Sequence, residues 1–551
     1  MLAAEALLRS LKSNGVDYLF ANAGSDFAPI IEACANAGGD DIPESIMVAF
    51  ENVAVAMAHG YYLASGTAQA AMVHVNVGLA NAVMGLINAH SDDVPVIMMS
   101  GRTPLTEGNR PGARVSPIQY GQEQFDQTSM VRDVVKWNYE LRYGDQAADL
   151  VSRAVAIANS EPKGAVYLSL PREPLCEDVP APADIPTQVP ASAPHPDWSE
   201  IADVALRLNA AKNPLIICSR GDTAGRTHTA LTGLLDKYQA SCAEVFVTRN
   251  VMASEHPTVI GRVLKNELPK ADVVVVVDTP VAWIETQVQP DPDACIIHIG
   301  QDPLFSRLPV RGYKTDLAIA GDTATALNLL AEAVDARDIS PETTALHSAY
   351  RTSVASARKD GATGVPTKEY VAGCISDILG DDGIVVNERG ATALFYDLPE
   401  GNRFFGNAQS GGLGWALPAA LGVQLADRDR LVVCTTGDGS YMFANPVACH
   451  QVAEAYDLPI LTVVVNNQAW DAVRTSALAI FPDGAAAKAN TMPMVPINNV
   501  PDFAMIARAS RAHAVKVERA EDLPAALAEA VRIIREEKRQ VLLDVTVRPD
   551  P

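Results

Sequence analysis

Cysteine is scarce and scattered in this 551-residue sequence, and no two cysteines form a CxxC pair. Disulfide-rich secreted domains and zinc knuckles both need closely spaced cysteines, so the spacing argues against both classes. We interpret most of these residues as reduced core residues. The eight positions are Cys34, Cys176, Cys218, Cys242, Cys295, Cys374, Cys434 and Cys449.

The sequence also lacks a run of about eighteen apolar residues, the length that a helix needs to cross a bilayer. The N-terminus, MLAAEALLRSLKSNGV, has helical spacing but no long apolar region typical of a signal peptide. Positive charge is in short supply, because 43 Lys and Arg face 66 Asp and Glu, a formal net charge of −23 at pH 7. An acidic surface repels nucleic acid and anionic membrane, so we expect neither as a partner and expect a cytoplasmic protein.

Length and hydrophobic content predict about three globular domains, since 48% of the residues are hydrophobic and 20% are charged. In the first stretch, short β-branched runs alternate with amphipathic helices. Examples are a helix over 51–65, a strand over 70–75 and a helix over 79–90. This alternation predicts an α/β fold of parallel sheets flanked by helices.

Changes in composition divide the chain into three α/β units joined by two linkers. The first linker is rich in proline, which favours an extended and semi-rigid connection. The first and third units are similar in kind, although no residue-level repeat relates them. The predicted boundaries are 1–175 for the first unit, 176–196 for the proline-rich linker, 197–335 for the central unit, 336–366 for a polar linker and 367–551 for the third unit.

The most informative feature is a pair of strand ends in the third unit. Gly437-Asp438-Gly439-Ser440 follows one buried strand and opens a helix, and Asn466-Asn467 ends the next strand. The 26 residues between them (440 through 465) fit a strand, a helix and a strand. Both turns should therefore emerge at the carboxyl edge of one parallel sheet, where ligands bind.

The residues at these turns suit a magnesium diphosphate. Mg²⁺ takes about six hard oxygen ligands, which Asp438, the amide of Asn467 and the backbone carbonyl of Ala469 can partly supply. Gly437 and Gly439 let the backbone approach a phosphate, and the following helix N-terminus presents free N–H groups. An ordinary Asp-Gly turn is the alternative, and the second turn at matching spacing argues against it.

The pattern GDGS-x25-NN resembles the diphosphate motif of thiamine-diphosphate-dependent enzymes. The segment GGLGWALPAALGVQL, residues 411–425, is similar to the loop and helix that precede this motif in the family. The three units also match the family's pyrimidine-binding, central and diphosphate-binding domains, so the resemblance covers essentially the whole chain. It points to the acetolactate synthase-like and benzoylformate decarboxylase-like members, the three-domain 2-oxo acid decarboxylases.

The resemblance implies thiamine diphosphate and Mg²⁺ as cofactors. Leu413 would be the bulky residue that holds the cofactor in a bent shape, with an ordinary core leucine as the alternative. For Glu388, contact with the diphosphate and capping of a helix stay open. The implied cofactor contacts are Glu51, Glu388, Gly412, Leu413, Gly437, Asp438, Gly439, Ser440, Asn467, Ala469 and Trp470, with Asp438, Asn467 and Ala469 as the metal ligands.

The family also predicts a glutamate at a strand-to-helix turn of the first domain, and Glu51 in SIMVAFENVAV occupies such a turn. By resemblance, its carboxyl group hydrogen-bonds the aminopyrimidine ring and promotes the imino tautomer, which removes the thiazolium C2 proton. The alternative is a glutamate that stabilises a helix N-terminus through the helix dipole.

Three further residues are candidates for contact with substrate. Ser25 and His74 follow predicted strands and resemble the serine and histidine of benzoylformate decarboxylase-like members. His74 would exchange a proton with an intermediate, and Ser25 would hold the substrate carboxylate. Gln122 resembles a glutamine near the cofactor in acetolactate synthase-like members, and a small shift in alignment makes Gln124 the alternative.

These features predict a lyase or transferase that breaks or forms a carbon–carbon bond in a 2-oxo acid or a 2-hydroxy ketone. A 2-oxo acid decarboxylase or carboligase comes first. The alternatives are a 2-hydroxyacyl lyase, a 2-oxo acid oxidase with FAD in the central domain, and an inactive regulatory homologue. The glycine-bearing segment 218–226 invites a flavin interpretation, but we favour a βα connection for it. The family implies a homodimer at least, with a homotetramer as the expected assembly.

Overall fold

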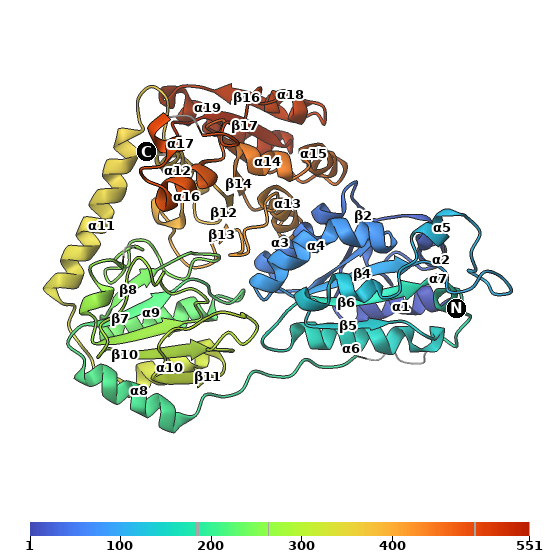
Figure 1. Ribbon diagram of the computed structural model, residues 1–551, viewed down its shortest axis with the longest axis horizontal. Helices are drawn as coiled ribbons and strands as arrows, with labels where there is room; N and C mark the ends of the chain where they lie inside the picture. The colour runs from blue at the N-terminus through green and yellow to red at the C-terminus, as the bar shows by residue number, and fades with distance from the viewer. Residues whose placement is uncertain (182–184, 186, 263, 490–491, 550–551) are drawn as a thin grey trace.

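Three parallel β-sheets organise the protein and lie at the corners of a triangle (Figure 1). The computed structural model describes residues 1–551 except 182–184, 186, 263, 490–491 and 550–551. Every strand pairing within the three sheets is parallel. This confirms the predicted α/β class, with helices covering the sheets.

The first sheet has the strand order β2-β1-β3-β4-β6-β5. Its strands β3 and β6 are buried along their whole length because helices cover both faces. The strands are β1 (Tyr18–Asn22), β2 (Glu44–Met47), β3 (Gln69–Val73), β4 (Val96–Arg102), β5 (Trp137–Glu140) and β6 (Val166–Pro171). The helices are α1 (Ala3–Ser13), α2 (Ala28–Asn36), α3 (Glu51–Ser65), α4 (Val75–Ser91), α5 (Ile118–Gly121), α6 (Ala147–Asn159) and α7 (Arg172–Leu175), with short 3₁₀ turns η1 (Ser25–Phe27), η2 (Gln127–Met130), η3 (Arg132–Val134) and η4 (Gly144–Gln146).

The central sheet has the order β11-β10-β9-β7-β8. An extended segment leads into its first helix along the lower side of Figure 1, and the 20-residue helix α11 runs from this lobe to the third. The elements are α8 (Trp198–Ala210), β7 (Pro214–Cys218), α9 (Arg226–Tyr238), β8 (Ser241–Glu244), η5 (Leu268–Lys270), β9 (Val273–Val277), β10 (Cys295–Gly300), β11 (Leu317–Ala320), α10 (Thr323–Ala333) and α11 (Pro341–Asp360).

The third sheet, β13-β12-β14-β15-β17-β16, repeats the strand order of the first. Its strands are β12 (Ile384–Glu388), β13 (Phe404–Gly406), β14 (Val432–Gly437), β15 (Leu461–Asn466), β16 (His513–Val517) and β17 (Val541–Thr546). Its helices are α12 (Lys368–Leu379), η6 (Ala393–Phe395), α13 (Ala416–Ala426), α14 (Asp438–Phe443), α15 (Pro446–Ala455), α16 (Asp471–Ile480), α17 (Ala485–Ala489), α18 (Phe503–Arg508), η7 (Ala520–Asp522), α19 (Leu523–Arg532) and the π-turn η8 (Ile533–Glu537).

Each sheet falls inside one of the units predicted from composition, and the exact domain boundaries stay a prediction. Pro182 and Pro186 of the predicted proline-rich linker lie outside the described residues. The predicted start of a helix at Leu79 is wrong, because α4 begins at Val75 and so follows His74 directly. Within the described residues, we find no helix with the length and apolar character that crossing a membrane requires.

Helices α3 and α13 join the first and third lobes through an apolar seam in which two glycines leave no room for a side chain (Figure 1). A Cβ atom at Gly60 would lie 2.0 Å from the carbonyl oxygen of Ala419, and one at Gly422 would lie 2.0 Å from that of Met57. Since residue 57 faces 422 and residue 60 faces 419, the two helices run antiparallel. The N-terminal ends of α3 and α13 therefore point in opposite directions, separated by the length of a helix pair, on the order of 20 Å.

Candidate active site

The two turns predicted from spacing lie next to each other at the carboxyl edge of the third sheet. Asp438 begins α14 immediately after β14, which pairs with β15. One carboxylate oxygen of Asp438 accepts the N–H of Gly439 at 2.6 Å, and the other accepts the N–H of Gln468 at 2.6 Å. Because Gln468 follows Asn467, the second bond ties one turn to the other.

Asp438 is a buried acid in a setting that favours a cation. Its side chain belongs to a residue only 3% exposed, and burial raises the pKa of its carboxyl group. The two backbone N–H bonds oppose this rise, whereas the nearby charge of Asp471 adds to it. Among the described residues, no Lys or Arg forms an ion pair with Asp438. A divalent cation would supply the missing positive charge.

The oxygen set at these turns fits Mg²⁺ better than a transition metal. The described residues contain no group of three or more His, Cys, Asp and Glu that could hold a metal. The turns offer one carboxylate, the amide oxygen of Asn467, which accepts the Ala469 N–H at 3.0 Å, and the backbone carbonyl of Ala469. Mg²⁺ is held by few protein oxygens and completes its shell with phosphate and water, so the set suits a magnesium diphosphate.

Both turns open into a cleft of about 1220 Å³ between the third and central lobes. Trp470 covers the turn, since a Cβ atom at Gly439 would lie 2.3 Å from the Trp470 ring. Within the described residues, no side chain of the first sheet lines this cleft. The predicted cofactor contacts that line it are Leu413, Gly437, Asp438, Gly439, Ser440, Asn467, Ala469 and Trp470.

Glu388, in contrast, caps a helix. Its buried carboxylate accepts the N–H groups of Gly414, Trp415 and Ala416 at 2.7, 2.6 and 2.8 Å, at the start of α13. These bonds satisfy donors that the first turn of a helix leaves unpaired. Glu388 does not line the cleft, so the structure favours capping over the predicted contact with the diphosphate.

Arg389, the residue after Glu388, lines the cleft instead. Arg389 is exposed, lines the cleft and has a left-handed φ of 66° that turns the chain at the strand end. Its Cβ atom lies 3.2 Å from the place where Gly437 would carry a side chain. Gly412 was also predicted to contact the cofactor, but it faces α4, where a Cβ atom would lie 2.5 Å from the sulfur of Met84.

The remaining predicted residues lie at the carboxyl edge of the first sheet. Glu51 is the first residue of α3, is half-buried and accepts a hydrogen bond from the amide of Asn81 at 3.0 Å. His74 follows β3, and its Nε2 atom lies 3.1 Å from the amide nitrogen of Gln122. Ser25 begins η1 with an exposed side chain.

Sequence reasoning missed Asp26, which lies between the predicted Ser25 and the sheet. Its Oδ1 atom is 2.5 Å from Nδ1 of His74. This hydrogen bond raises the pKa of His74, and the charges of Asp26 and Glu51 act in the same direction, whereas burial lowers it. The only sequence signal was an acidic residue beside Ser25 after a strand, which is too common to single out.

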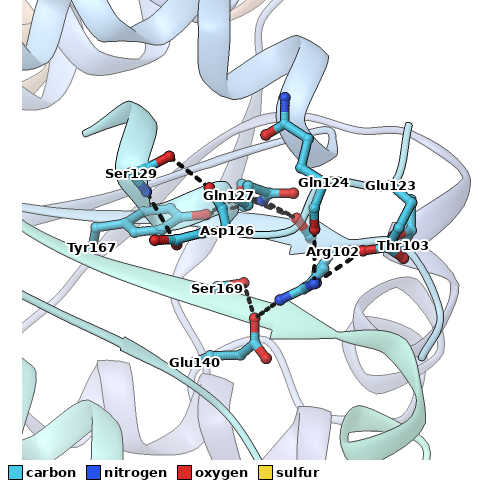
Figure 2. Close-up of polar contacts among 12 residues, drawn as sticks. Arg102, Thr103, Glu123, Gln124, Asp126, Gln127, Ser129, Glu140, Tyr167 and Ser169 are labelled. Carbon is cyan, nitrogen blue, oxygen red and sulfur yellow. Dashed lines mark hydrogen bonds and ion pairs between the residues drawn. The ribbon is translucent and has the colours of Figure 1, made fainter. Parts of the chain in front are cut away.

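A network of ion pairs fixes the segment that carries Gln122. Arg102, at the end of β4, donates to Glu140 at 2.5 Å, to Glu123 at 2.9 Å and to the carbonyl oxygen of Gln124 at 3.1 Å (Figure 2). Because Glu123 follows Gln122 directly, this network sets where the Gln122 side chain starts.

The structure also distinguishes Gln122 from Gln124, the alternative candidate. The Gln124 side chain points away from Arg102 in Figure 2, and its buried Oε1 atom has no hydrogen-bond partner. Gln122 is the one that reaches His74. Further along, buried Gln127 donates to the carbonyl oxygen of Gly101 at 2.9 Å and closes the loop against the sheet.

Sequence profiles of protein families identify the domains that carry these two sheet edges. The thiamine pyrophosphate enzyme profiles match as the N-terminal TPP binding domain over residues 1–130, the central domain over 201–330 and the C-terminal TPP binding domain over 387–545. The chain belongs to the thiamine pyrophosphate enzymes. The two TPP binding domains are the ones that carry the two edges described above.

Curated relatives match the chain over nearly its whole length. The acetolactate synthase isozyme 3 large subunit of Escherichia coli K12 is 24% identical over 99% of this chain and 94% of its own. The benzoylformate decarboxylase of Pseudomonas aeruginosa is 25% identical over 98% of both chains. Their two names show that thiamine pyrophosphate enzymes with this level of sequence identity to the chain catalyse different reactions.

Solved structures of thiamine pyrophosphate enzymes share the fold. The thiamine diphosphate-dependent 4-hydroxybenzoylformate decarboxylase of Rhodococcus jostii RHA1 superposes with a TM-score of 0.82 at 22% identity, covering 100% of both chains. A putative thiamin diphosphate-dependent enzyme of Mycobacterium smegmatis gives 0.81 at 24% identity, also over 100% of both chains. The matched TPP binding domains imply thiamine diphosphate as the cofactor.

Proposed function

We propose that this chain decarboxylates a 2-oxo acid with thiamine diphosphate and Mg²⁺. The product is either an aldehyde or, when a second carbonyl compound accepts the fragment, a 2-hydroxy ketone. The observation that carries the proposal is the joined pair of turns at Asp438 and Asn467, which opens on the cleft. The names of the relatives, an acetolactate synthase and a benzoylformate decarboxylase, favour a 2-oxo acid as substrate.

Residues of the third lobe would hold the cofactor. When bound, thiamine diphosphate supplies a nucleophilic carbon and an electron sink. Asp438, Asn467 and the carbonyl of Ala469 would bind Mg²⁺. The N–H groups at the start of α14 and the guanidinium of Arg389 would bind phosphate oxygens, because both are donors at the mouth of the turn.

Residues of the first lobe would handle protons and the substrate. The Glu51 carboxyl group, oriented by Asn81, would hydrogen-bond the aminopyrimidine ring. His74 would exchange a proton with the reacting carbon or its oxygen, and Gln122 beside it would face the same crevice. The exposed hydroxyl of Ser25 would bind the substrate carboxylate.

We further propose that two copies of the chain complete each site. The antiparallel seam places Glu51 and Leu413 at opposite ends of the α3–α13 pair, so Glu51 cannot reach the cleft of its own chain. Exposed aromatic side chains lie near both half-sites, with Phe125 fully exposed and Phe443 56% exposed. Apolar side chains of this size favour burial against a partner. A homodimer is then the minimum, and a homotetramer joins two such dimers.

A substrate panel tests the reaction. Aliphatic and aromatic 2-oxo acids are incubated with the protein, thiamine diphosphate and Mg²⁺, and CO₂, aldehyde and 2-hydroxy ketone are measured. We expect CO₂ release that needs both cofactors. If no 2-oxo acid is decarboxylated while 2-hydroxyacyl compounds are cleaved, the proposal gives way to a lyase.

Mixed assemblies test the shared site. Glu51→Gln and Asp438→Ala are each expected to be inactive, but co-expression should restore about a quarter of the wild-type activity. Half of the randomly formed dimers contain one copy of each variant, and one of the two sites in such a dimer joins two intact halves. A site within one chain would instead give no gain over the parent variants.

A flavin oxidase has less support. Arg220 in segment 218–226 pairs with Asp93 at 2.7 Å and with Asp278 at 3.3 Å, beyond the ends of β7 and β9, which are neighbours in the central sheet. Asp222 accepts the N–H of Arg226 at 3.2 Å near the start of α9, so the segment serves as a βα connection. We expect purified protein without flavin absorbance. A stoichiometric flavin spectrum would reverse this ranking.

A further inference from the structure

The His74 ring is held on both of its nitrogen atoms. Buried Asp26, which is 5% exposed, contacts Nδ1 at 2.5 Å, and the amide nitrogen of Gln122 contacts Nε2 at 3.1 Å. The three residues come from η1, the end of β3 and the end of α5, so distant parts of the first domain converge on one ring. Such convergence is typical of a ring whose orientation matters.

Two glycines make room for this arrangement. A Cβ atom at Gly24 would lie 2.1 Å from Nδ1 of His74, and one at Gly101 would lie 1.7 Å from Oδ2 of Asp26. Any side chain at either position would collide with the pair. The Asp26 side chain is 4% exposed and that of His74 is 18% exposed, so the ion pair is mostly shielded from solvent and is stronger than a fully exposed one.

The backbone beside His74 is strained, and Asp26 stabilises it. Val75 has a φ of 32°, a conformation that a β-branched residue rarely adopts. Its N–H donates to Oδ2 of Asp26 at 3.2 Å, so one carboxylate binds both the ring and the strained backbone. Strain of this kind persists where the surrounding contacts overdetermine it.

We propose that Asp26 is a positioning residue that fixes the tautomer of His74, and that Gln122 occupies Nε2 until substrate replaces it. Asp26 accepts the Nδ1 proton, so Nε2 is the nitrogen that exchanges a proton with substrate. This inference rests on the proposed function and deepens it, because it assigns the direction of proton transfer within the same site.

The hydrogen-bond directions follow from the tautomer. In the neutral ring, Nδ1–H donates to Asp26 and Nε2 accepts from the amide N–H of Gln122. When Nε2 carries a proton it is a donor, and Gln122, whose amide nitrogen faces it, has to move away. Release of an aldehyde from a 2-oxo carboxylate consumes one proton, which Nε2–H delivers to the reacting carbon and solvent then replaces, while Asp26 stays ionised. The charged groups that face His74 are Asp26 and Glu51, both acidic, and both favour the protonated ring.

The two partners should therefore shift the pKa of His74 in opposite directions. Asp26→Asn removes the charge that stabilises the imidazolium, so it should lower the pKa of His74. Gln122→Ala removes a donor that stabilises the neutral ring, so it should raise the pKa. Gln124→Ala is the matched control, because Gln124 lies on the same loop without contacting His74, and it should leave the pKa unchanged.

The experiment follows His74 by NMR in full-length protein labelled at the histidine imidazoles, with the resonance assigned by its loss in His74→Gln. This titration needs no turnover, so it separates failure of the inference from failure of the proposed function. Opposite shifts in the two variants support the proposal. Unchanged values, or shifts in the same direction, overturn it. A loss of resonance dispersion in Asp26→Asn leaves Gln122→Ala and its control to decide the question.

Kinetics supply the second readout if a 2-oxo acid is turned over. Asp26→Asn should lower kcat by about 10- to 100-fold with KM changed less than about threefold, because the proton acceptor is misdirected while binding persists. The pH midpoint of kcat should move with the NMR pKa. A change in KM with kcat unaltered would contradict a role in proton transfer.

Discussion

The first and third lobes use one strand order for two kinds of chemistry. In both sheets the chain follows the same pattern of crossovers, so strands at equivalent positions can be compared. The third strand is followed by His74 in one lobe and by Asp438 in the other. The fourth strand is followed by a loop fixed through Arg102 in one lobe and by Asn467 in the other. The fold supplies the positions, and the residues at the strand ends decide between proton transfer and metal binding.

The two edges also differ in how their charge is balanced. His74 has its counter-charge built in, because Asp26 is in direct contact and raises its pKa. Among the residues that the structure describes, buried Asp438 accepts hydrogen bonds from backbone N–H groups alone, and burial raises its pKa. The charge at the first edge is therefore balanced within the protein, whereas the charge of Asp438 at the other edge needs a cation. Variants at the two edges should fail in different ways.

The largest expected effect is on turnover in Glu51→Gln. The amide keeps the shape of the side chain but cannot share a proton, so kcat should fall by about 100-fold or more. Thiamine diphosphate should still bind within a few-fold of wild type by calorimetry, because Asp438 and Asn467 remain. Glu44→Gln, on the exposed part of β2, serves as the control and should be fully active. Equal loss of binding and turnover would contradict the separation of the two edges.

Asp438→Ala should show the reverse pattern. Removing the Asp438 carboxylate should weaken magnesium-dependent cofactor binding by about 100-fold, roughly 2.7 kcal/mol. Part of the turnover should return at high Mg²⁺ and cofactor, which Glu51→Gln should not show. Tight cofactor binding to Asp438→Ala at low Mg²⁺ would refute the metal assignment.

Glu388→Gln should affect stability rather than binding. The neutral amide cannot accept three backbone N–H groups as well as a carboxylate does, so the cost is about 2 kcal/mol. The thermal midpoint should fall by roughly 4 °C. Calorimetry should find cofactor affinity unchanged within about threefold, and a large loss would restore Glu388 as a cofactor contact.

The smallest effect concerns pH. The pKa of His74 is raised in the folded protein, whereas in the unfolded chain it lies near the ordinary value of about 6.5. The ion pair with Asp26 therefore stabilises the fold fully below about pH 6.5, and this contribution is lost as pH rises through the folded pKa. Differential scanning calorimetry should show the advantage of wild type over His74→Gln shrinking from pH 6 to pH 8, by about 1 °C. If the stability advantage of wild type over His74→Gln grew with pH, folding would lower the pKa of His74 instead of raising it.

Elements with a strong local pattern were predictable from the sequence. Helix 51–65 was predicted at its observed bounds, because its apolar residues and the glycine that follows it mark its extent. The strand predicted over 70–75 is observed as β3 over Gln69–Val73. Short edge strands such as β13 were missed, since three residues carry too little periodicity.

In the candidate site, spacing along one βαβ unit predicted that Asp438 and Asn467 would be neighbours. The contact between Asp26 and His74 crosses 48 residues, and no local pattern announces it. The capping role of Glu388 depends in the same way on where α13 begins, 28 residues further on. Roles inferred by resemblance stay predictions until the variants above are measured.

The glycine seam between α3 and α13 has a mechanical consequence. With no space for even a methyl group at Gly60 and Gly422, the first and third lobes cannot slide past one another without losing this contact. The opposite wall of the cleft belongs to the central lobe, which backbone hydrogen bonds tie to the third lobe: the Asn250 N–H donates to the Phe404 carbonyl oxygen at 3.1 Å, and the Gly406 N–H donates to that of Thr248 at 2.9 Å. Both walls are therefore anchored to one frame. We expect that a bound molecule is enclosed by side chains that move at the rim of the cleft, and not by the swing of a whole lobe.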